Sequence, residues 1–340
     1  EISECLVGSE MCIRDRMRSM PDGEHYTAMN DARNMIIKYS YRTGNPVDTL
    51  FNTEKARECT FDKFDGYTIS STGHHILVWC DTEPIYRRSF KANVYDYDVR
   101  RNYVKPISDS KGKQMIPTFS PDGRMVAYVS DNNIWIRKFD YDTEVQVTKD
   151  GEMNKILNGI TDWVYEEEFA VTNLMAWSPN SEQLAFVRFD ESEVPLMEMM
   201  RFDGKLYNQA YSFKYPKAGE RNSVVQLWIA DLETGARERI DTGEETDQYI
   251  PRIGWTPDGR PWYYRLNRRQ NTFEMIVCEP HGAQRTVYEE RAQQYVERVD
   301  DGTVTFVDRD RFLVRQESHT GFMHLYLYSL RRGILEQVTK

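Results

Sequence analysis

Short β-rich runs, each preceded by a tight turn of polar residues, recur along most of this chain. The clearest turn is Ser120-Pro121-Asp122-Gly123, and residues 124–129 (RMVAYV) follow it. In such a turn proline presets φ, aspartate caps the turn and glycine takes the positive φ. The run that follows has the composition of a strand. Further copies of the turn lie at residues 21–23, 71–73, 178–181, 256–259 and 308–310.

The spacing of these turns indicates a repeat. Gly23, Gly73 and Gly123 stand 50 residues apart, and Gly259 and Asp310 are separated by 51. A period near 50 residues, with one tight turn and several short strands per unit, is typical of β-propeller blades. A solenoid of strands is the competing interpretation, but its repeats are usually shorter and lack these hairpin turns. We therefore expect an all-β fold, a β-propeller of four-stranded antiparallel blades, with about six blades in residues 19–340.

Two intervals exceed the repeat. Ser120 and Ser178 are 58 residues apart, and Ser178 and Thr256 are 78 apart. Because the extra length cannot join a four-stranded blade, we expect it to leave the sheets as loops. The first surplus contains residues 162–169, and the second contains residues 189–195 and 215–222.

Composition excludes several function classes. Aromatic residues make up 13% of the 340 residues, which favours strands. A formal net charge of −10 argues against a nucleic-acid partner. No apolar run approaches the roughly 20 residues that a transmembrane helix needs. Strands and helices do not alternate, so the sequence gives no sign of an α/β second domain.

The sequence predicts no metal or cofactor site. None of the five cysteines forms a CxxC pair, and a bridge among Cys59, Cys80 and Cys278 is left open. His74 and His75 are adjacent and would point to opposite faces of a strand. Phosphate-binding loops, EF-hand loops and HExxH are missing.

Residues 1–18 fit nothing that follows. They show no period, and their apolar run is too short and too acidic at its start for a signal peptide. Residues 5–16 look like a translated sequencing-adapter scar. We set residues 1–18 aside as non-native or disordered.

Residues 158–169 (NGITDWVYEEEF) carry three consecutive carboxylates directly after three apolar side chains. The simplest interpretation is a solvated helix face or loop. The alternative is a carboxylate clamp for a primary ammonium, whose three N–H donors two carboxylates can share. In a strand Glu167 and Glu168 would diverge to opposite faces, so a clamp requires a helical turn or an irregular loop.

The run from Asp162 to Glu168 closely resembles the double-glutamate motif of the dipeptidyl peptidase IV family, in the prolyl oligopeptidase clan of serine peptidases. The resemblance implies that Glu167 and Glu168 hold the free α-amino group of a peptide substrate. Residues 85–90 (IYRRSF) resemble the family segment whose arginine contacts a substrate carbonyl. That arginine falls on Arg87, with Arg88 as a close competitor, and a surface arginine at a blade edge is the plainer interpretation. An aromatic residue that the family supplies later does not align clearly, and residues 295–298 occupy its approximate place.

The family's propeller has eight blades and is followed by an α/β-hydrolase domain. A serine hydrolase of this clan needs a G-x-S-x-G elbow, with aspartate and histidine later in the chain. No G-x-S-x-G occurs here, so we assign no catalytic residue. We expect residues 19–340 to be a truncated N-terminal propeller whose ring is incomplete, without its hydrolase domain and inactive alone.

The function expected from the resemblance is substrate gating in a serine-type dipeptidyl peptidase that removes Xaa-Pro or Xaa-Ala dipeptides. Its partners would be peptides with a free N-terminus, the hydrolase domain and a second subunit in a homodimer. The resemblance also implies a periplasmic or exported protein. The alternatives are a non-enzymatic propeller scaffold for protein partners and an inactive relative whose serine is replaced. A G-x-S-x-G motif further along the gene would discriminate between the scaffold and the peptidase.

Overall fold

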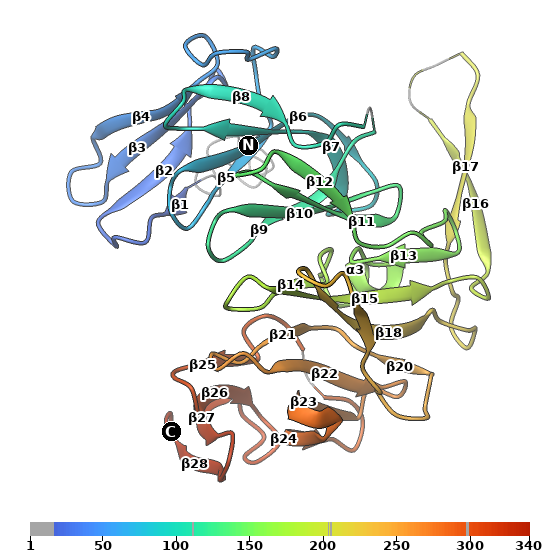
Figure 1. The fold of residues 1–340 in the computed structure, drawn as a ribbon. Coiled ribbons are helices and arrows are strands. Elements are labelled where there is room, and N and C mark those ends of the chain that lie inside the picture. The colour runs from blue at the N-terminus through green and yellow to red at the C-terminus, as the bar shows by residue number, and fades with distance from the viewer. Residues whose placement is uncertain (1–16, 111, 203, 205, 297–298) are drawn as a thin grey trace, which may run out of the picture. The chain divides into compact units, whose positions relative to one another are not determined.

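The computed structural model describes residues 17–110, 112–202, 204, 206–296 and 299–340 (Figure 1). Within them the chain is almost entirely β, with one α-helix, α3 (Trp163–Glu168), and one 3-10 helix, η1 (Pro280–Gly282). None of the helices in this part of the chain has the length and apolar character to cross a bilayer. The expected all-β class is confirmed.

The chain divides into two compact units. The first contains the chain up to Glu83 together with Lys91–Val126 and Arg137–Asp142, and the second contains Pro84–Phe90, Ala127–Ile136 and Thr143–Lys340. The loop that joins β6 to β7 therefore belongs to the second unit, although both strands lie largely in the first.

Two four-stranded sheets in the first unit follow the order of the chain. The strands of the first sheet are β1 (Arg18–Ser19), β2 (His25–Met29), β3 (Met35–Ser40) and β4 (Pro46–Asn52). Those of the second are β5 (Gly66–Ile69), β6 (His75–Pro84), β7 (Phe90–Asp98) and β8 (Tyr103–Pro106). The third sheet, whose strands are divided between the units, consists of β9 (Met115–Phe119), β10 (Met125–Ser130), β11 (Asn133–Lys138) and β12 (Thr143–Gln146).

The second unit continues the series. Its first sheet consists of β13 (Ile156–Asn158), β14 (Met175–Trp177), β15 (Gln183–Asp190), β18 (Val224–Asp231) and β19 (Arg237–Arg239). The next consists of β20 (Gln248–Tyr249), β21 (Ile253–Trp255), β22 (Pro261–Asn267), β23 (Thr272–Cys278) and β24 (Gln284–Arg291). The last consists of β25 (Val304–Phe306), β26 (Arg311–Gln316), β27 (His324–Ser329) and β28 (Gly333–Gln337). A separate two-stranded sheet pairs β16 (Leu196–Arg201) with β17 (Gln209–Lys214).

The repeated turn occupies the same place in every larger sheet. Each copy joins two consecutive antiparallel strands that pair with each other, and the pairs are β1–β2, β5–β6, β9–β10, β14–β15, β21–β22 and β25–β26. At the clearest copy the Ser120 hydroxyl donates to an Asp122 carboxylate oxygen at 2.5 Å, and the Gly123 N–H donates to the Ser120 carbonyl at 2.9 Å. Gly123 has φ +71°, which disfavours a side chain. The repeat read from the sequence is thus a repeat of sheets.

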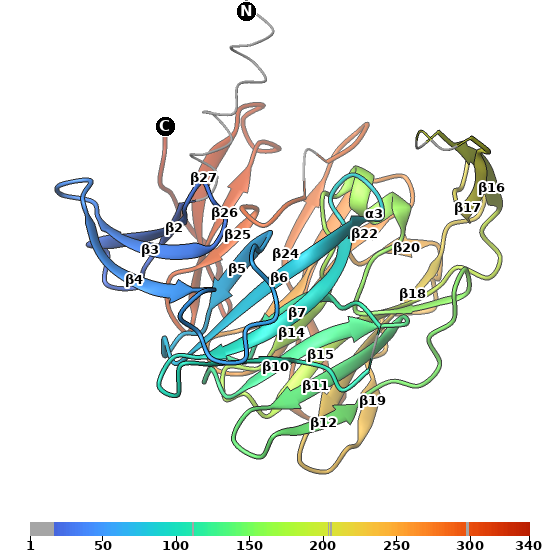
Figure 2. The same ribbon diagram turned by 90° about the horizontal axis from the view of Figure 1, so that it is seen from above.

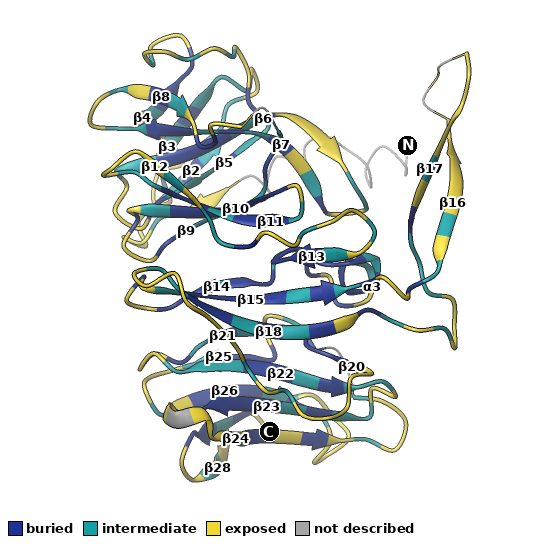
Figure 3. Ribbon diagram, turned by 45° about the vertical axis from the view of Figure 1, so that its right-hand side comes forward, coloured by how far each residue is buried: buried dark blue, intermediate teal, exposed yellow. Residues whose placement is uncertain are grey.

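Both surplus intervals leave the sheets, as expected. The first forms α3, between β13 and β14, and the second forms the β16–β17 hairpin, between β15 and β18. The hairpin extends away from the sheet that contains β15 and β18 (Figures 1 and 3). It exposes large apolar side chains, among them Met199, Met200 and Phe202.

The core of the first unit follows from strand alternation. Its buried residues come from strands of both sheets and the connection between them: Ile36, Phe51, Phe64, Tyr67, Ile76, Val78, Tyr97 and Val104. Phe51 lies at the centre, with its ring centroid 4.9 Å from that of Tyr97 and 5.5 Å from that of Phe64. Each fully buried ring of this kind stabilises the fold by about 1.5–3 kcal/mol.

The expectation for residues 1–18 is tested only at its end. Residues 1–16 lie outside the described residues, and Arg18 belongs to β1 and pairs with Thr27, so it is part of the fold.

The thiols of Cys59, Cys80 and Cys278 are free, so the bridge left open does not form among them. Burial raises the pKa of both Cys80 and Cys278 to about 12, which keeps these thiols protonated at neutral pH.

Candidate functional site

The acidic run folds as α3 because Asp162 caps the helix. Asp162 has extended backbone angles (φ −76°, ψ 178°), and its Oδ1 accepts the Tyr165 N–H at 2.9 Å. Its Oδ2 accepts the Ser223 hydroxyl at 2.6 Å, which ties the helix start to the segment before β18. Burial raises the pKa of Asp162, and the hydrogen bonds from Ser223 and Tyr165 oppose that rise.

Contacts from the β20–β21 region anchor the rest of the helix. The Tyr165 hydroxyl oxygen accepts the Ile250 N–H at 2.8 Å, and the Arg252 guanidinium donates to the Phe169 carbonyl at 3.0 Å. The Tyr165 ring meets the Phe189 ring edge to face, with centroids 4.7 Å apart. The Tyr249 ring of β20 has its centroid 6.0 Å from that of Tyr165, and Figure 2 shows α3 close to β20. The glutamates that follow Tyr165 are therefore carried by a fixed turn of helix.

The three consecutive glutamates have three different environments. Glu166 is buried at 1% exposure, the Glu167 side chain is 27% exposed, and Glu168 is exposed. Successive residues on a helix are about 100° apart, so Glu167 and Glu168 can face one region, whereas on a strand they would diverge. The helical turn that a carboxylate clamp requires is present.

Arg87 lies against this turn. Its Nε is 3.0 Å from Glu167 Oε2, and a terminal guanidinium nitrogen is 2.9 Å from Glu167 Oε1, so the pair is bidentate. The Glu168 side chain has no hydrogen-bond or ion-pair partner among the described residues. The structure thus brings Arg87 and Glu167 into contact, next to an adjacent carboxylate that is open to solvent.

Arg88, the competing arginine, makes different contacts. Its guanidinium donates to the Glu166 backbone carbonyl at 3.1 Å, and its own N–H donates to Glu166 Oε1. The Ser89 N–H donates to the same carboxylate oxygen at 2.8 Å. Sequence reasoning missed Glu166, because nothing in an acidic run shows which member turns inward.

Aromatic residues and a second buried acid line the flank of α3. The Trp163 and Tyr215 ring centroids are 4.3 Å apart, and those of Tyr86 and Phe213 are 5.6 Å apart. Glu191 is only 5% exposed, and burial, together with the charge of Asp162, raises its pKa to about 7. This flank is apolar with buried acid groups, in contrast to the exposed carboxylate of Glu168.

Residues 295–298 occupy the approximate place of the aromatic residue that the family supplies later. Tyr295 is 62% exposed, and none of the ring contacts described for α3 and its flank involves it. Residues 297 and 298, the last two of the segment 295–298, lie outside the described residues.

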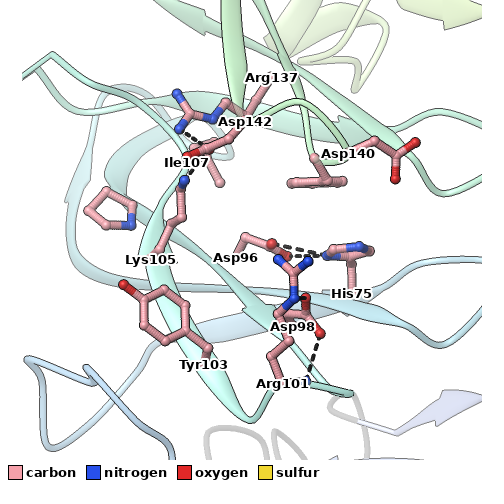
Figure 4. A pocket seen from close by; sticks show the side chains of 12 residues that line it. His75, Asp96, Asp98, Arg101, Tyr103, Lys105, Ile107, Arg137, Asp140 and Asp142 are labelled. Carbon is pink, nitrogen blue, oxygen red and sulfur yellow. Dashed lines mark hydrogen bonds and ion pairs between the residues drawn. The ribbon is translucent and has the colours of Figure 1, made fainter.

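The first unit contains a polar pocket (Figure 4). It has a volume of about 260 Å³, and inside it His75 Nδ1 is 3.0 Å from both carboxylate oxygens of Asp96, while the His75 ring stacks on Phe139 at 4.2 Å. Burial lowers the pKa of His75, but the hydrogen bond and charge of Asp96 outweigh it, so the net shift is upward.

The other charges of this pocket largely neutralise one another. Arg137 pairs with Asp109 at 3.0 Å and with Asp142, which also pairs with Lys105. The pocket therefore offers no strong surplus of one charge to a ligand. Among the described residues, no three His, Cys, Asp or Glu side chains are arranged to hold a metal ion.

Comparison with known proteins identifies a family to which the chain is similar. A family model described as the dipeptidyl peptidase IV (DPP IV) N-terminal region matches residues 70–340. The chain belongs to the dipeptidyl peptidase IV family. Human prolyl endopeptidase FAP is 30% identical over 264 residues, which cover 76% of this chain and 34% of the relative. Mouse inactive dipeptidyl peptidase 10 is 28% identical over 320 residues, or 88% of this chain and 40% of that protein.

A solved structure of this family shares the fold. The crystal structure of Porphyromonas gingivalis dipeptidyl peptidase 4 superposes with a TM-score of 0.90 at 50% identity, covering 95% of this chain and 46% of that chain. The β-propeller of four-stranded antiparallel blades that the repeat predicted is thereby confirmed. The chain spans roughly a third to two-fifths of the length of the curated relatives given above.

Proposed function

We propose that this chain is the substrate-gating propeller of a serine-type dipeptidyl peptidase that removes Xaa-Pro or Xaa-Ala dipeptides from peptide N-termini. Glu167 and Glu168 hold the α-ammonium group of the substrate, and Arg87 contacts a substrate carbonyl. A hydrolase domain of the same protein cuts the bond, so the 340 residues alone, which contain no G-x-S-x-G motif, are not expected to hydrolyse peptides.

The bidentate pair between Arg87 and Glu167 is the observation that carries this proposal. The Arg87 side chain is 68% exposed, and an ion pair in such a setting contributes only about 0–1 kcal/mol to stability. The Arg87–Glu167 pair therefore matters less for stability than for bringing a cation and two carboxylates together at one surface. An incoming ammonium can bind between Glu167 and Glu168 while Arg87 remains as a donor for the substrate carbonyl.

Anchoring the α-amine makes the site a ruler. An extended chain advances about 3.3–3.6 Å per residue, so the second peptide bond lies roughly 7 Å from the anchored end. Fixing one end of the substrate converts a search over many bonds into the presentation of one bond, and this reduces the entropic barrier. The ruler supports the release of dipeptides, and the family relationship supports proline or alanine as the second residue.

The test uses the complete protein and a chromogenic Xaa-Pro substrate. We expect Glu167→Ala and Glu168→Ala each to lower kcat/KM about tenfold to a hundredfold, since hydrogen bonds to charged groups are worth about 1.5–3 kcal/mol. Glu193→Ala is the matched control, because Glu193 is a 77% exposed carboxylate that pairs with Arg221 outside the cluster. Acetylation of the substrate amine should abolish cleavage by the unaltered protein. Full activity in both glutamate variants would refute the clamp.

We further propose that the complete protein is a homodimer in which the β16–β17 hairpin contacts a second copy. The hairpin stands away from its neighbouring sheet, and Met199, Met200 and Phe202 expose apolar surface that water solvates poorly (Figure 3). Light scattering on the complete protein with Met200→Glu and Phe202→Glu should show monomers. A variant that remains a dimer would exclude the hairpin as the interface.

An inactive family member is the second candidate, and the match to mouse inactive dipeptidyl peptidase 10 favours it. A non-enzymatic scaffold for protein partners is the third. The complete sequence distinguishes them, because a peptidase carries G-x-S-x-G with its aspartate and histidine, an inactive relative has the serine replaced, and a scaffold lacks the hydrolase domain. We also propose a periplasmic or exported location, which cell fractionation tests.

A further inference from the structure

The loop between β6 and β7 presents Arg87 from a tight, internally bonded turn. The Ile85 N–H donates to the Ser89 carbonyl at 2.9 Å, and the Tyr86 N–H donates to the Ser89 hydroxyl at 3.3 Å. These bonds leave the N–H groups of Arg88 and Ser89, the two residues after Arg87, to find an acceptor outside the loop.

Glu166 is that acceptor. Its Oε1 takes both N–H groups, with Ser89 N at 2.8 Å, and its backbone carbonyl takes the Arg88 guanidinium at 3.1 Å. The same helix that carries Glu167 therefore holds the loop beside Arg87 through two backbone N–H groups and one side chain. These contacts join residues 77 or 78 positions apart in the chain.

Burying the Glu166 carboxylate costs free energy, and this cost suggests that the residue has a specific role. Glu166 is 1% exposed, and its Oε2 is buried without a hydrogen-bond partner in the structure. Burying an acceptor without a partner is unfavourable. The carboxylate instead uses its other oxygen to fix two adjacent backbone donors, which a hydrophobic side chain at this position could not do.

We propose that Glu166 is a positioning residue that orients Arg87 against Glu167, and thereby prepares the site for its peptide. This inference rests on the function proposed above and adds a residue to it. Arg87 is a long, 68% exposed side chain that would otherwise spread over many rotamers. Fixing the backbone one residue away limits that freedom and places the guanidinium where the substrate carbonyl arrives.

The experiment is a double-mutant cycle in the complete protein. Glu166→Ala, Glu166→Asp and Glu166→Gln are each made with Arg87 intact and in the Arg87→Ala background, and kcat and KM are measured on an Xaa-Pro substrate. With Arg87 intact, we expect Glu166→Ala to lower kcat/KM on the order of a hundredfold, and no further than Arg87→Ala does. In the Arg87→Ala background it should have little further effect.

The conservative variants separate geometry from charge. Glu166→Gln retains an oxygen that can accept both N–H groups, so it should keep most of the activity. Glu166→Asp keeps the charge but withdraws the acceptor by one methylene, so it should lose activity, and it serves where the alanine variant does not fold. Glu290→Ala is the control, because Glu290 is 6% exposed and accepts the Tyr288 hydroxyl at 2.8 Å in another sheet. It should lower the melting temperature without any coupling to Arg87.

The outcomes are distinct. Losses from Glu166→Ala and Arg87→Ala that multiply, or an unimpaired Glu166→Asp, would overturn the positioning role while leaving the proposed function in place. Unchanged cleavage in the single variants Arg87→Ala and Glu167→Ala would instead overturn the proposed function.

Discussion

Glu191 should make the stability of this protein depend on pH. It directly follows β15 and is 5% exposed, and burial and the nearby charge of Asp162 raise its pKa from 4.5 to about 7. Lys214 opposes this rise, but its ammonium donates to the carbonyls of Ser192 and Val194. The charged form of Glu191 is therefore poorly compensated in the folded state.

The sign and size of the effect follow from linkage. Because the folded-state pKa lies above the unfolded-state value, the folded protein binds more protons between pH 4.5 and 7. The contribution of Glu191 is fully present below pH 4.5 and is lost as the pH rises through 7. A shift from 4.5 to about 7, at about 1.4 kcal/mol per unit, corresponds to about 3 kcal/mol of unfolding free energy.

The perturbation is Glu191→Gln, which imitates the protonated acid at every pH. Urea unfolding of both proteins between pH 4.5 and 8.5 should show equal stability at the acidic end. Near pH 8.5 the variant should be more stable by up to about 3 kcal/mol. Glu193→Gln, two residues along and 77% exposed, is the control and should follow the unaltered protein. A constant difference between Glu191→Gln and the unaltered protein across this range would refute the reasoning.

Three further substitutions test the anchoring of the helix and the polar pocket. Tyr165→Phe leaves the buried Ile250 N–H without an acceptor, so urea unfolding should show a loss of about 1–3 kcal/mol. Asp162→Ala removes the cap of α3 and should lower the unfolding free energy by about 0.5–2 kcal/mol in the same assay. Asp96→Asn removes the charge that outweighs burial at His75, so the imidazole pKa, followed by NMR, should fall.

The repeat of sheets could be predicted from the sequence because its signals are local. Proline, aspartate and glycine determine each turn by their own backbone preferences, and the turns recur at a fixed spacing. The need for a helical turn at Glu167 and Glu168 also follows from local geometry, because a strand would separate them. α3 supplies that turn.

The contacts around the site could not be predicted in the same way. The choice between Arg87 and Arg88, and the burial of Glu166, depend on a loop and a helix that are about 80 positions apart. No periodicity links residues at that separation, and only the folded chain brings them together. The sequence motif points to Glu167 and Glu168, whereas the buried Glu166 is recognised only from the N–H groups that it accepts in the folded chain.

A six-residue helix such as α3 cannot persist in an isolated peptide, because closing the first turn is costly and isolated helices shorter than about 12–15 residues are marginal in water. Its cap, its tyrosine and its first glutamate all depend on strands or loops formed 61 to 85 residues away in the chain. A chain in which these strands and loops have not formed therefore does not hold the three glutamates on a turn of helix. The peptide clamp proposed above requires these strands and loops to be in place, and it would be lost when they separate from α3.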